Sequence, residues 1–337
     1  MKVSVVSPAN IAFIKYWGRA DHQIFLPRNN NISMTMSGCA TTTTVETGNF
    51  SSDDVQVKFF EKEYTVLEKD SIKAKNIFDQ IERIRDLAKS SQRVRIKSEN
   101  NFPADAGIAS SASSFSALTA ALLLAFGLNE KFEDKVELSR QVRLCGSGSA
   151  IRSVYGGFVE FLTGHDHETS YAVQIADENY WDLVDLVAVV DPEKKKISSS
   201  ECHQLADTSP YFETRIKEMQ PRIDIVRQAI LDRDFRKLGP EIERDSNSLH
   251  IVMMTQIPAA FYWAPGTISI MKSIMDWRED DDLQAYFTID AGANVHVICE
   301  KKDAVEVKKR LQNNEYVKWI IENKPCAGTH IISEHLF

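Results

Sequence analysis

Pro103-Ala-Asp-Ala-Gly-Ile-Ala-Ser-Ser-Ala-Ser-Ser114 is the stretch that decides the fold, because it leads directly into an apolar helix pattern. Apolar residues at helical spacing run from Phe115 to Phe126, and Gly127 is placed to end the predicted helix. Small residues before a helix let backbone N–H groups approach a phosphate, and the helix N-terminus adds about half a positive charge. Serine is also a good N-cap, so the stretch alone predicts either a phosphate-binding loop or a capped, closely packed helix.

Strand and helix patterns intermix on both sides of this loop. Alternating or β-branched runs predict strands at 2–6, 32–45, 55–60, 93–97, 154–162, 183–190, 285–289, 295–299 and 329–333. Apolar residues at helical spacing predict helices at 72–87, 133–145, 211–238, 258–277 and 304–311. The order lacks the regular βαβ alternation of a doubly wound sheet, so we expect the α+β class.

A proline followed by a charge run, Asp191-Pro-Glu-Lys-Lys-Lys196, predicts the domain boundary. The chain of 337 residues is long enough for two packed domains, which we place at 1–190 and 191–337. No repeat with a period of roughly 20–50 residues is visible, which argues against a solenoid.

Charge and composition narrow the class of protein. Lys and Arg total 40 against 48 for Asp and Glu, a net charge of -8, which argues against a broad nucleic-acid-binding surface. No stretch reaches roughly 20 apolar residues and no signal-peptide pattern begins the chain, so we expect neither a membrane span nor secretion. The 5 cysteines are scattered without a Cys-x-x-Cys motif, which favours reduced thiols in the cytoplasm.

Three further segments carry polar residues that catalysis could use, and each also has an ordinary structural explanation. Arg152 lies in the serine-rich loop 146–153 and could bind a carboxylate or phosphate through two hydrogen bonds, or make a surface ion pair. Asp290 lies between two predicted strands and could deprotonate an alcohol, or simply form a turn. Lys15, among apolar and aromatic neighbours, could be buried near an active centre or extend to solvent.

Several common sites are disfavoured by missing motifs. Neither Gly-x-x-x-x-Gly-Lys-Ser/Thr nor Gly-x-Gly-x-x-Gly occurs, which argues against P-loop and Rossmann nucleotide sites. No Gly-x-Ser-x-Gly elbow occurs, which argues against an α/β-hydrolase. His165-Asp-His167 has the look of a metal pair, but its polar neighbours favour a solvated loop.

Taken together, these segments indicate a protein family far more specifically than any one of them does alone. The sequence resembles the diphosphomevalonate decarboxylases, within the wider GHMP kinase superfamily. The stretches that carry the resemblance are Pro8-Ala-Asn-Ile-Ala-Phe-Ile-Lys-Tyr-Trp-Gly18, Leu26-Pro-Arg-Asn-Asn-Asn-Ile-Ser33, Asn101-Phe-Pro-Ala-Asp-Ala-Gly-Ile-Ala-Ser-Ser-Ala-Ser113, Gly146-Ser-Gly-Ser-Ala-Ile-Arg-Ser153 and Asp290-Ala-Gly-Ala-Asn-Val-His296. They occur in the family's order and span most of the chain.

The resemblance implies a fold, a reaction and partners. The N-terminal half is expected to resemble ribosomal protein S5 domain 2 and to bind ATP, and the C-terminal half is expected to be ferredoxin-like and to supply the catalytic aspartate. The implied reaction is ATP-dependent decarboxylation of (R)-5-diphosphomevalonate to isopentenyl diphosphate, with Mg²⁺ bridging the ATP phosphates. A phosphomevalonate decarboxylase that gives isopentenyl phosphate, or a 3-hydroxyl kinase that does not decarboxylate, are the alternatives. The family commonly forms homodimers.

Site residues are implied by matching positions. Asp290 is expected near the C3 hydroxyl, Lys15 near Asp290 and the transferred phosphate, and Arg152 at the substrate carboxylate. The positions that match the family's substrate-binding residues are Asn10, Tyr16, Arg19, Ser147 and Ser149. The positions that match its ATP phosphate loop are Gly107, Ala109, Ser110, Ser111 and Ser113. No side chain is assigned as a metal ligand.

The sequence departs from the family's usual pattern at several positions. Arg19 replaces a lysine and keeps the charge, and Asn31 stands where the family usually has serine. Asp105 adds an acid to the phosphate loop. The stretch from Lys195 to Glu201 lacks the arginine that helps some members bind diphosphate, so the choice between mono- and diphosphate substrate stays open. Residues 1–45 nevertheless carry four basic side chains and one acidic one, which predicts a locally basic cleft.

Overall fold

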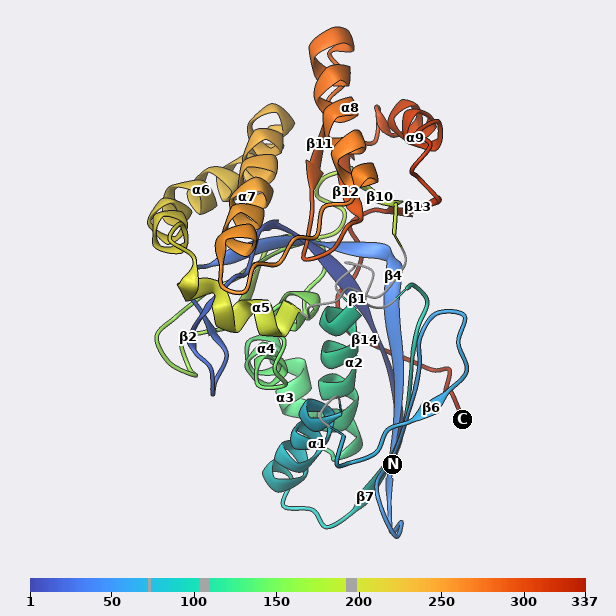
Figure 1. The fold of residues 1–337 in the computed structure, drawn as a ribbon. Coiled ribbons are helices and arrows are strands. Elements are labelled where there is room, and N and C mark those ends of the chain that lie inside the picture. The colour runs from blue at the N-terminus through green and yellow to red at the C-terminus, as the bar shows by residue number, and fades with distance from the viewer. Residues whose placement is uncertain (72–73, 104–109, 192–198) are drawn as a thin grey trace.

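Two β-sheets with their covering helices make up the computed structural model, which describes residues 1–71, 74–103, 110–191 and 199–337. The helices between residues 75 and 143 gather at one end of the molecule, and those between residues 212 and 312 gather at the other (Figure 1). The sequence-based prediction of an α+β fold is confirmed. Among the described helices, none combines the length and the apolar character needed to cross a bilayer.

The larger sheet is built around two long strands, β1 (Lys2–Ile14) and β4 (Asn31–Gly48). They pair antiparallel over most of their length, from Lys2 opposite Glu46 to Ile14 opposite Ile32. The other strands of this sheet are β5 (Asp54–Lys58), β6 (Thr65–Val66), β7 (Arg93–Asn100), β8 (Phe158–Phe161), β9 (Ala172–Ala176) and β14 (His330–Ile332). A small separate hairpin pairs β2 (Arg19–Asp21) with β3 (Leu26–Pro27).

The serine-rich stretch leads into α2 (Ser110–Ala125), the helix that the sequence predicts there. Its residues from Ala117 to Ala125 are all buried, because the helix lies between the sheet and its helical neighbours. A helix that is apolar on every side needs such a central position. The neighbours are α1 (Lys75–Leu87), α3 (Asn129–Glu133), α4 (Lys135–Arg143) and the short 3₁₀ helix η1 (Ala150–Ser153).

The smaller sheet has the strand order β11 (Ala285–Thr288), β12 (Val295–Glu300), β10 (Leu183–Val189), β13 (Trp319–Asn323). Alternate residues of β12 point to opposite faces. Val295, Val297 and Cys299 pack with residues of α8 (Pro265–Asp281) and α9 (Ala304–Gln312), whereas Ile298 belongs to the core shared with β1 and β4. Strand β10, which precedes the predicted domain boundary, is thus part of the smaller sheet. The division of the chain into domains 1–190 and 191–337 stays a prediction.

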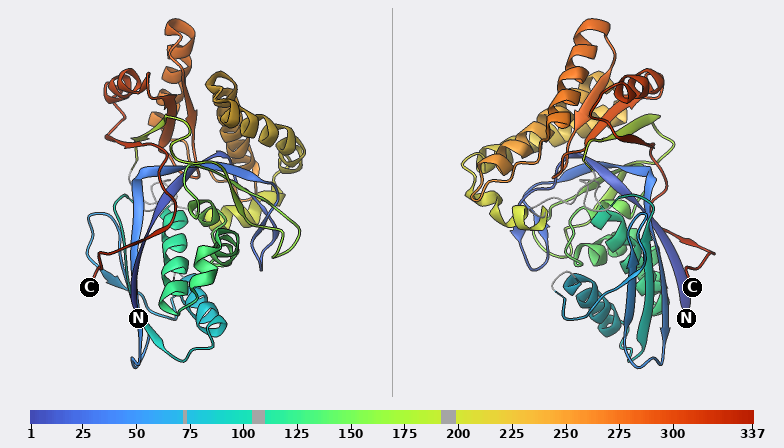
Figure 2. Two further views of the ribbon diagram at one scale, coloured as in Figure 1. Left: turned by 180° about the vertical axis from the view of Figure 1, so that it is seen from behind. Right: turned by 45° about the vertical axis from the view of Figure 1, so that its right-hand side comes forward.

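The chain returns to the larger sheet at its C-terminal end. Strand β14 pairs antiparallel with β1, with Ser4 opposite Ile332. The Lys2 Nζ atom donates a hydrogen bond of 3.1 Å to the carbonyl oxygen of Phe337. The two views in Figure 2 accordingly show the N- and C-terminal ends beside each other.

The sequence-based prediction of one continuous helix over 211–238 is wrong. The structure has two helices there, α6 (Phe212–Asp232) and α7 (Phe235–Thr255). The break falls at Arg233, whose φ of 54° is left-handed, and Asp234 caps α7 by accepting a hydrogen bond from the Lys237 N–H. Gly239 and Pro240 in the second turn of α7 give it a weak helix pattern, and so the sequence analysis missed it. Similarly, the helix predicted at 258–277 begins only at Pro265.

We predict that Gly239→Ala destabilises the protein although alanine is the better helix former. A Cβ at Gly239 would lie 2.1 Å from Cδ2 and 2.3 Å from Cγ of Tyr286, atoms close to the stem of that ring. Overpacking costs about 1–3 kcal/mol, against a helix-propensity gain of about 1 kcal/mol. Urea unfolding should show a net loss. In a Tyr286→Ala background the same substitution should cost nothing, and an equal loss in both backgrounds would contradict the steric explanation.

Candidate active site

A buried ion pair joins the two sheets at the centre of the predicted site. Lys15 directly follows β1, and Asp290 lies in the turn between β11 and β12. The Lys15 Nζ atom lies 2.6 Å from Asp290 Oδ1. The lysine side chain is 3% exposed, whereas that of the aspartate is 23% exposed. The carboxylate is therefore fixed by its partner and still reachable from outside.

The surroundings keep Asp290 ionised. Burial alone would raise the pKa of its carboxyl group, but Lys15, His296 and Arg152 all lower it, and together they outweigh burial. The pKa of Asp290 is therefore lowered from its ordinary value. An ionised carboxylate at neutral pH can accept a proton from a hydroxyl group only if another group stabilises the charge that develops, and Lys15 is in position to do so.

Arg152 is close enough to this pair to act on the charge of Asp290, and two asparagines hold its guanidinium. Its Nη2 donates to Asn10 Oδ1 at 3.2 Å, and its Nη1 donates to Asn31 Oδ1. Burial lowers the pKa of Arg152 to about 10, so the guanidinium stays charged at neutral pH. Its Nε is buried and has no partner among the described residues. Asn31, the departure from the family's serine, thus supplies an acceptor that positions this guanidinium.

The predicted substrate segments pack against each other. The Tyr16 hydroxyl accepts a hydrogen bond of 3.0 Å from Arg19 Nε. Gly148 lies against the same ring, where a Cβ would be 2.5 Å from Tyr16 Cζ. The hydroxyls of Ser147 and Ser149 are 3.0 Å apart. Loop 146–153 therefore needs glycine at 148 to approach the stretch that follows Lys15.

The predicted ATP-binding residues are described in part. Gly107 and Ala109 lie outside the described residues. The first turn of α2 carries Ser110, Ser111 and Ser113 and no acidic residue. Ser111 Oγ lies 3.2 Å from Ser147 Oγ, which brings this helix end to the substrate segment. Ser113 is fully buried, and its hydroxyl lies 2.7 Å from Thr41 Oγ1.

The residues that support this cluster on its inner side were not predicted from the sequence. Asp245 Oδ2 accepts a hydrogen bond of 2.7 Å from the Lys15 backbone N–H, across 230 positions of sequence. His203 Nδ1 accepts one of 3.2 Å from the Gly18 N–H, and its ring lies 4.2 Å from that of Trp17. A signal for Asp245 does exist in the sequence. It lies on the apolar stripe of α7, between Ile242 and Leu249, where a carboxylate is unusual.

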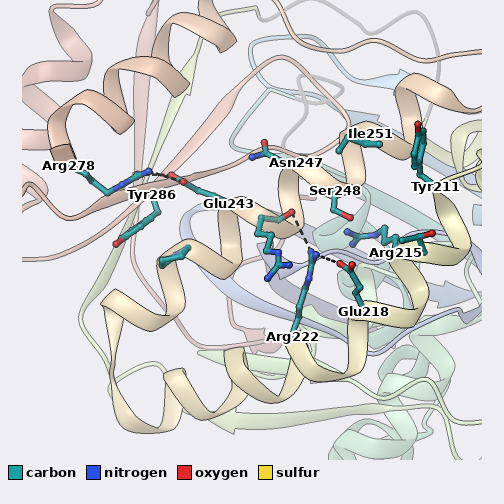
Figure 3. Close-up of a pocket in the computed structure, with 13 residues that line it drawn as sticks. Tyr211, Arg215, Glu218, Arg222, Glu243, Asn247, Ser248, Ile251, Arg278 and Tyr286 are labelled. Atoms are coloured by element: carbon teal, nitrogen blue, oxygen red, sulfur yellow. Dashed lines mark hydrogen bonds and ion pairs between the residues drawn. The ribbon is translucent and has the colours of Figure 1, made fainter.

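A pocket of about 630 Å³ lies on the side of α7 that faces away from the Lys15–Asp290 pair, between α6, α7 and the start of β11 (Figure 3). Arg215, Arg222 and Arg278 line it together with Glu218 and Glu243. None of the described predicted site residues lines it. It is therefore a place separate from the Lys15–Asp290 pair.

Comparison with known proteins establishes the class and then the family. The two-sheet α+β architecture is a GHMP-kinase-like fold. The Diphosphomevalonate decarboxylase-like N-terminal domain matches residues 7–172, and the Mevalonate 5-diphosphate decarboxylase C-terminal domain matches residues 185–325. The chain belongs to the diphosphomevalonate decarboxylase family.

Individual relatives align with this chain over nearly its whole length. Diphosphomevalonate decarboxylase of Ganoderma lucidum is 35% identical over 89% of this chain and 79% of the relative. The enzyme of Candida albicans is also 35% identical, over 90% and 86%. The crystal structure of mevalonate diphosphate decarboxylase from Staphylococcus aureus aligns with a TM-score of 0.88 at 31% identity, covering 98% of both chains. MDDEF in complex with MVAPP, AMPPCP and magnesium gives the same TM-score and identity, covering 98% and 99%.

We predict that His250 makes the protein less stable in mild acid. Burial lowers its pKa from 6.5 to about 3 in the folded state. As the pH falls below about 6.5, only the unfolded chain takes up this proton, so stability is lost progressively towards the folded pKa. This group should contribute a loss of about 2 kcal/mol between pH 7 and pH 5. Urea unfolding of His250→Gln should show a shallower pH dependence, and His165→Gln, at an exposed position, should leave it unchanged. Equal slopes in all three proteins would refute the assignment.

Proposed function

We propose that this chain catalyses the ATP-dependent decarboxylation of (R)-5-diphosphomevalonate to isopentenyl diphosphate, ADP, phosphate and CO₂. The observation that carries the proposal is the Lys15–Asp290 ion pair at 2.6 Å, which lies beside the buried Arg152 guanidinium in a chain of this family. The relative MDDEF, which has been solved with MVAPP, AMPPCP and magnesium, supports ATP and Mg²⁺ as co-substrate and cofactor.

Ser110 and Ser111 at the start of α2 are suited to the ATP phosphates, whereas Ser113 is fully buried beside them. Serine hydroxyls and a helix N-terminus are suited to phosphate oxygens, and the first turn has no acidic side chain to repel them. Ser110, Ser111 and Ser113 are the described residues assigned to this role, together with Gly107 and Ala109. Mg²⁺, when bound, supplies charge neutralisation for these phosphates.

Asp290 is assigned to the C3 hydroxyl, whose proton it accepts while the oxygen is phosphorylated. Lys15 offsets the change in charge at Asp290 and at the transferred group. A tertiary hydroxyl is a poor leaving group, and phosphorylation makes it a good one. When the phosphate leaves with its bonding electrons, positive charge develops at C3. The electron pair of the C–CO₂ bond then forms the new double bond.

Arg152 is assigned to the substrate carboxylate, which it holds in place until CO₂ is released. Its Nε, for which the described part of the chain offers no partner, and its orientation by Asn10 support this role. Tyr16, Arg19, Ser147 and Ser149, with Asn10, are assigned to the rest of the substrate. Arg19 and the serine hydroxyls provide donors for its phosphate groups.

We also propose that the protein works as a cytoplasmic homodimer. The 5 free cysteines, four of them buried, support a reducing compartment. The commonest closed assembly of identical chains is a two-fold dimer. Light scattering of the purified protein would test the assembly, and a monomeric mass at working concentration would exclude it.

The substrate assignment predicts a clear order among three compounds. Coupled ATP turnover and CO₂ release should be measured with mevalonate, its 5-phosphate and its 5-diphosphate. We expect kcat/KM for the diphosphate to exceed that for the monophosphate by at least about tenfold, as one charged hydrogen bond provides. A preference for the monophosphate would instead identify a phosphomevalonate decarboxylase. ADP release without CO₂ would identify a 3-hydroxyl kinase.

The role of Asp290 predicts a large loss of rate in Asp290→Asn. We expect kcat to fall by at least ~10³ while substrate still binds, because the carboxylate acts mainly in the transition state. Calorimetric titration of the variant with diphosphomevalonate would measure the binding separately from turnover. Near-normal turnover would remove Asp290 from the mechanism.

A further inference from the structure

One helix, α7, contacts the backbone on both sides of the Lys15–Asp290 pair. On the lysine side, Asp245 accepts a hydrogen bond of 2.7 Å from the Lys15 N–H. On the aspartate side, the next residue of the helix, Ser246, accepts one of 2.9 Å from the Ile289 N–H. Ile289 directly precedes Asp290. Consecutive side chains of one rigid element therefore fix the two strand ends that carry the ion pair.

The carbonyl oxygen of Ile289 is also contacted by two side chains of α7. Ser246 Oγ lies 3.4 Å from the Ile289 carbonyl oxygen, and His250 Nε2 lies 3.3 Å from the same oxygen. Ser246 and His250 are four residues apart, so they lie on the same face of α7. Both are buried, at 0% and 1% exposure. The backbone of the residue before Asp290 is thus held through its N–H and its C=O.

Asp245 needs a second partner, and Arg215 of α6 supplies it. Arg215 Nη2 donates to Asp245 Oδ1 at 2.8 Å, and Nη1 donates to the Asp245 carbonyl oxygen at 3.1 Å. Both side chains are buried. A buried ion pair contributes little net stability compared with an apolar pair of similar volume. It does impose direction, because the carboxylate must point at the Lys15 N–H and at the guanidinium at once.

We propose that Asp245 and Ser246 are positioning residues that set the separation of Lys15 and Asp290, with Arg215 orienting Asp245. The proposal rests on the proposed function, because it gives these residues a role only through the ion pair assigned to catalysis. A misplacement of about 1 Å in a catalytic group can cost roughly 10²-fold in rate. Neither residue touches the open side of the site, so their effect passes through the backbone of Lys15 and Ile289.

Glu243 provides a matched control on the same helix. Its carboxylate accepts two hydrogen bonds from Arg278, at 2.7 and 2.9 Å, and one of 3.1 Å from the Phe287 N–H. Figure 3 shows this pair extending from α7 to α8 at the edge of the pocket. Glu243 therefore has the same arrangement as Asp245, an arginine and a backbone N–H on one carboxylate, but it does not hold Lys15 or Ile289.

The test compares Asp245→Asn with Glu243→Gln in the full chain. The first readout is the Asp290 carboxyl pKa, followed by ¹³C NMR and assigned by its absence in Asp290→Asn. The titratable groups that face Asp290 are Lys15, Arg152, His296 and His250, and neither variant replaces any of them. A displaced Lys15 would no longer hold the pKa of Asp290 down, so we expect that pKa to rise in Asp245→Asn and to stay unchanged in Glu243→Gln. This readout does not require that the enzyme turn over the proposed substrate.

The second readout is catalysis. We expect kcat of Asp245→Asn to fall roughly 10–100-fold with KM values within about threefold of the parent, because positioning rather than binding is lost. Glu243→Gln should keep the kcat of the parent protein, even if its melting temperature falls as much as that of Asp245→Asn. If the parent protein were inactive on mevalonate, its 5-phosphate and its 5-diphosphate, the proposed function would be refuted. The NMR readout would still decide the positioning role. An active parent with Asp245→Asn matching Glu243→Gln in both readouts would overturn only the positioning role.

Ser246→Ala covers the case in which Asp245→Asn does not fold. It removes a single buried hydroxyl and leaves the ion pair of Arg215 and Asp245 intact. The Ile289 N–H then loses its partner, and we expect kcat to fall about fivefold to tenfold with unchanged KM. Unchanged kcat together with an unchanged Asp290 pKa would overturn the proposal.

Discussion

The interaction on which the rest of the site depends is the ion pair between a nearly inaccessible ammonium and a carboxylate from the other sheet. A buried lysine is costly unless an opposite charge lies within hydrogen-bond distance. Lys15 comes from the end of β1 and Asp290 from the turn after β11, so this requirement aligns strand ends of two separately hydrogen-bonded sheets. The cluster of Arg152, Asn10 and loop 146–149 is arranged around that alignment.

Phosphate chemistry in an acidic protein depends on where side chains point rather than on how many charges a segment holds. The basic side chains of residues 1–45, and others such as Arg143, are only partly directed at the site. Arg28 pairs with Asp207 and Glu213, and Arg143 donates to the Ile24 carbonyl oxygen at 2.9 Å. Lys15, Arg19 and Arg152 remain within the predicted cleft. A net charge of -8 is thus compatible with an anionic substrate, because a few buried cations determine the local field.

Short, continuous motifs made the larger part of the fold predictable from sequence, whereas the roles of the site residues stay predictions. The strand predicted at 2–6 is the start of β1, which extends to Ile14, and the helix predicted after the serine-rich stretch is α2. The strands predicted on both sides of Asp290 are β11 and β12. The support by α7 was missed, because Asp245 and Lys15 are 230 positions apart and their contact exists only after both sheets have packed. The division of α6 from α7 was missed for a local reason. A left-handed Arg233 ends the helix where glycine would normally mark the end.

Strand β14 has a consequence beyond completing a sheet. It lies along the outer side of β1, where Thr329, just before it, is hydrogen-bonded to Ser7, Ser116 and the Ser153 carbonyl oxygen. Without it, the backbone groups of β1 from Ser4 to Val6 would have no strand partner on that side. Such an open edge is a template for pairing with another chain. Strand β14 therefore covers this part of the edge of β1, where an uncovered strand could pair with another chain.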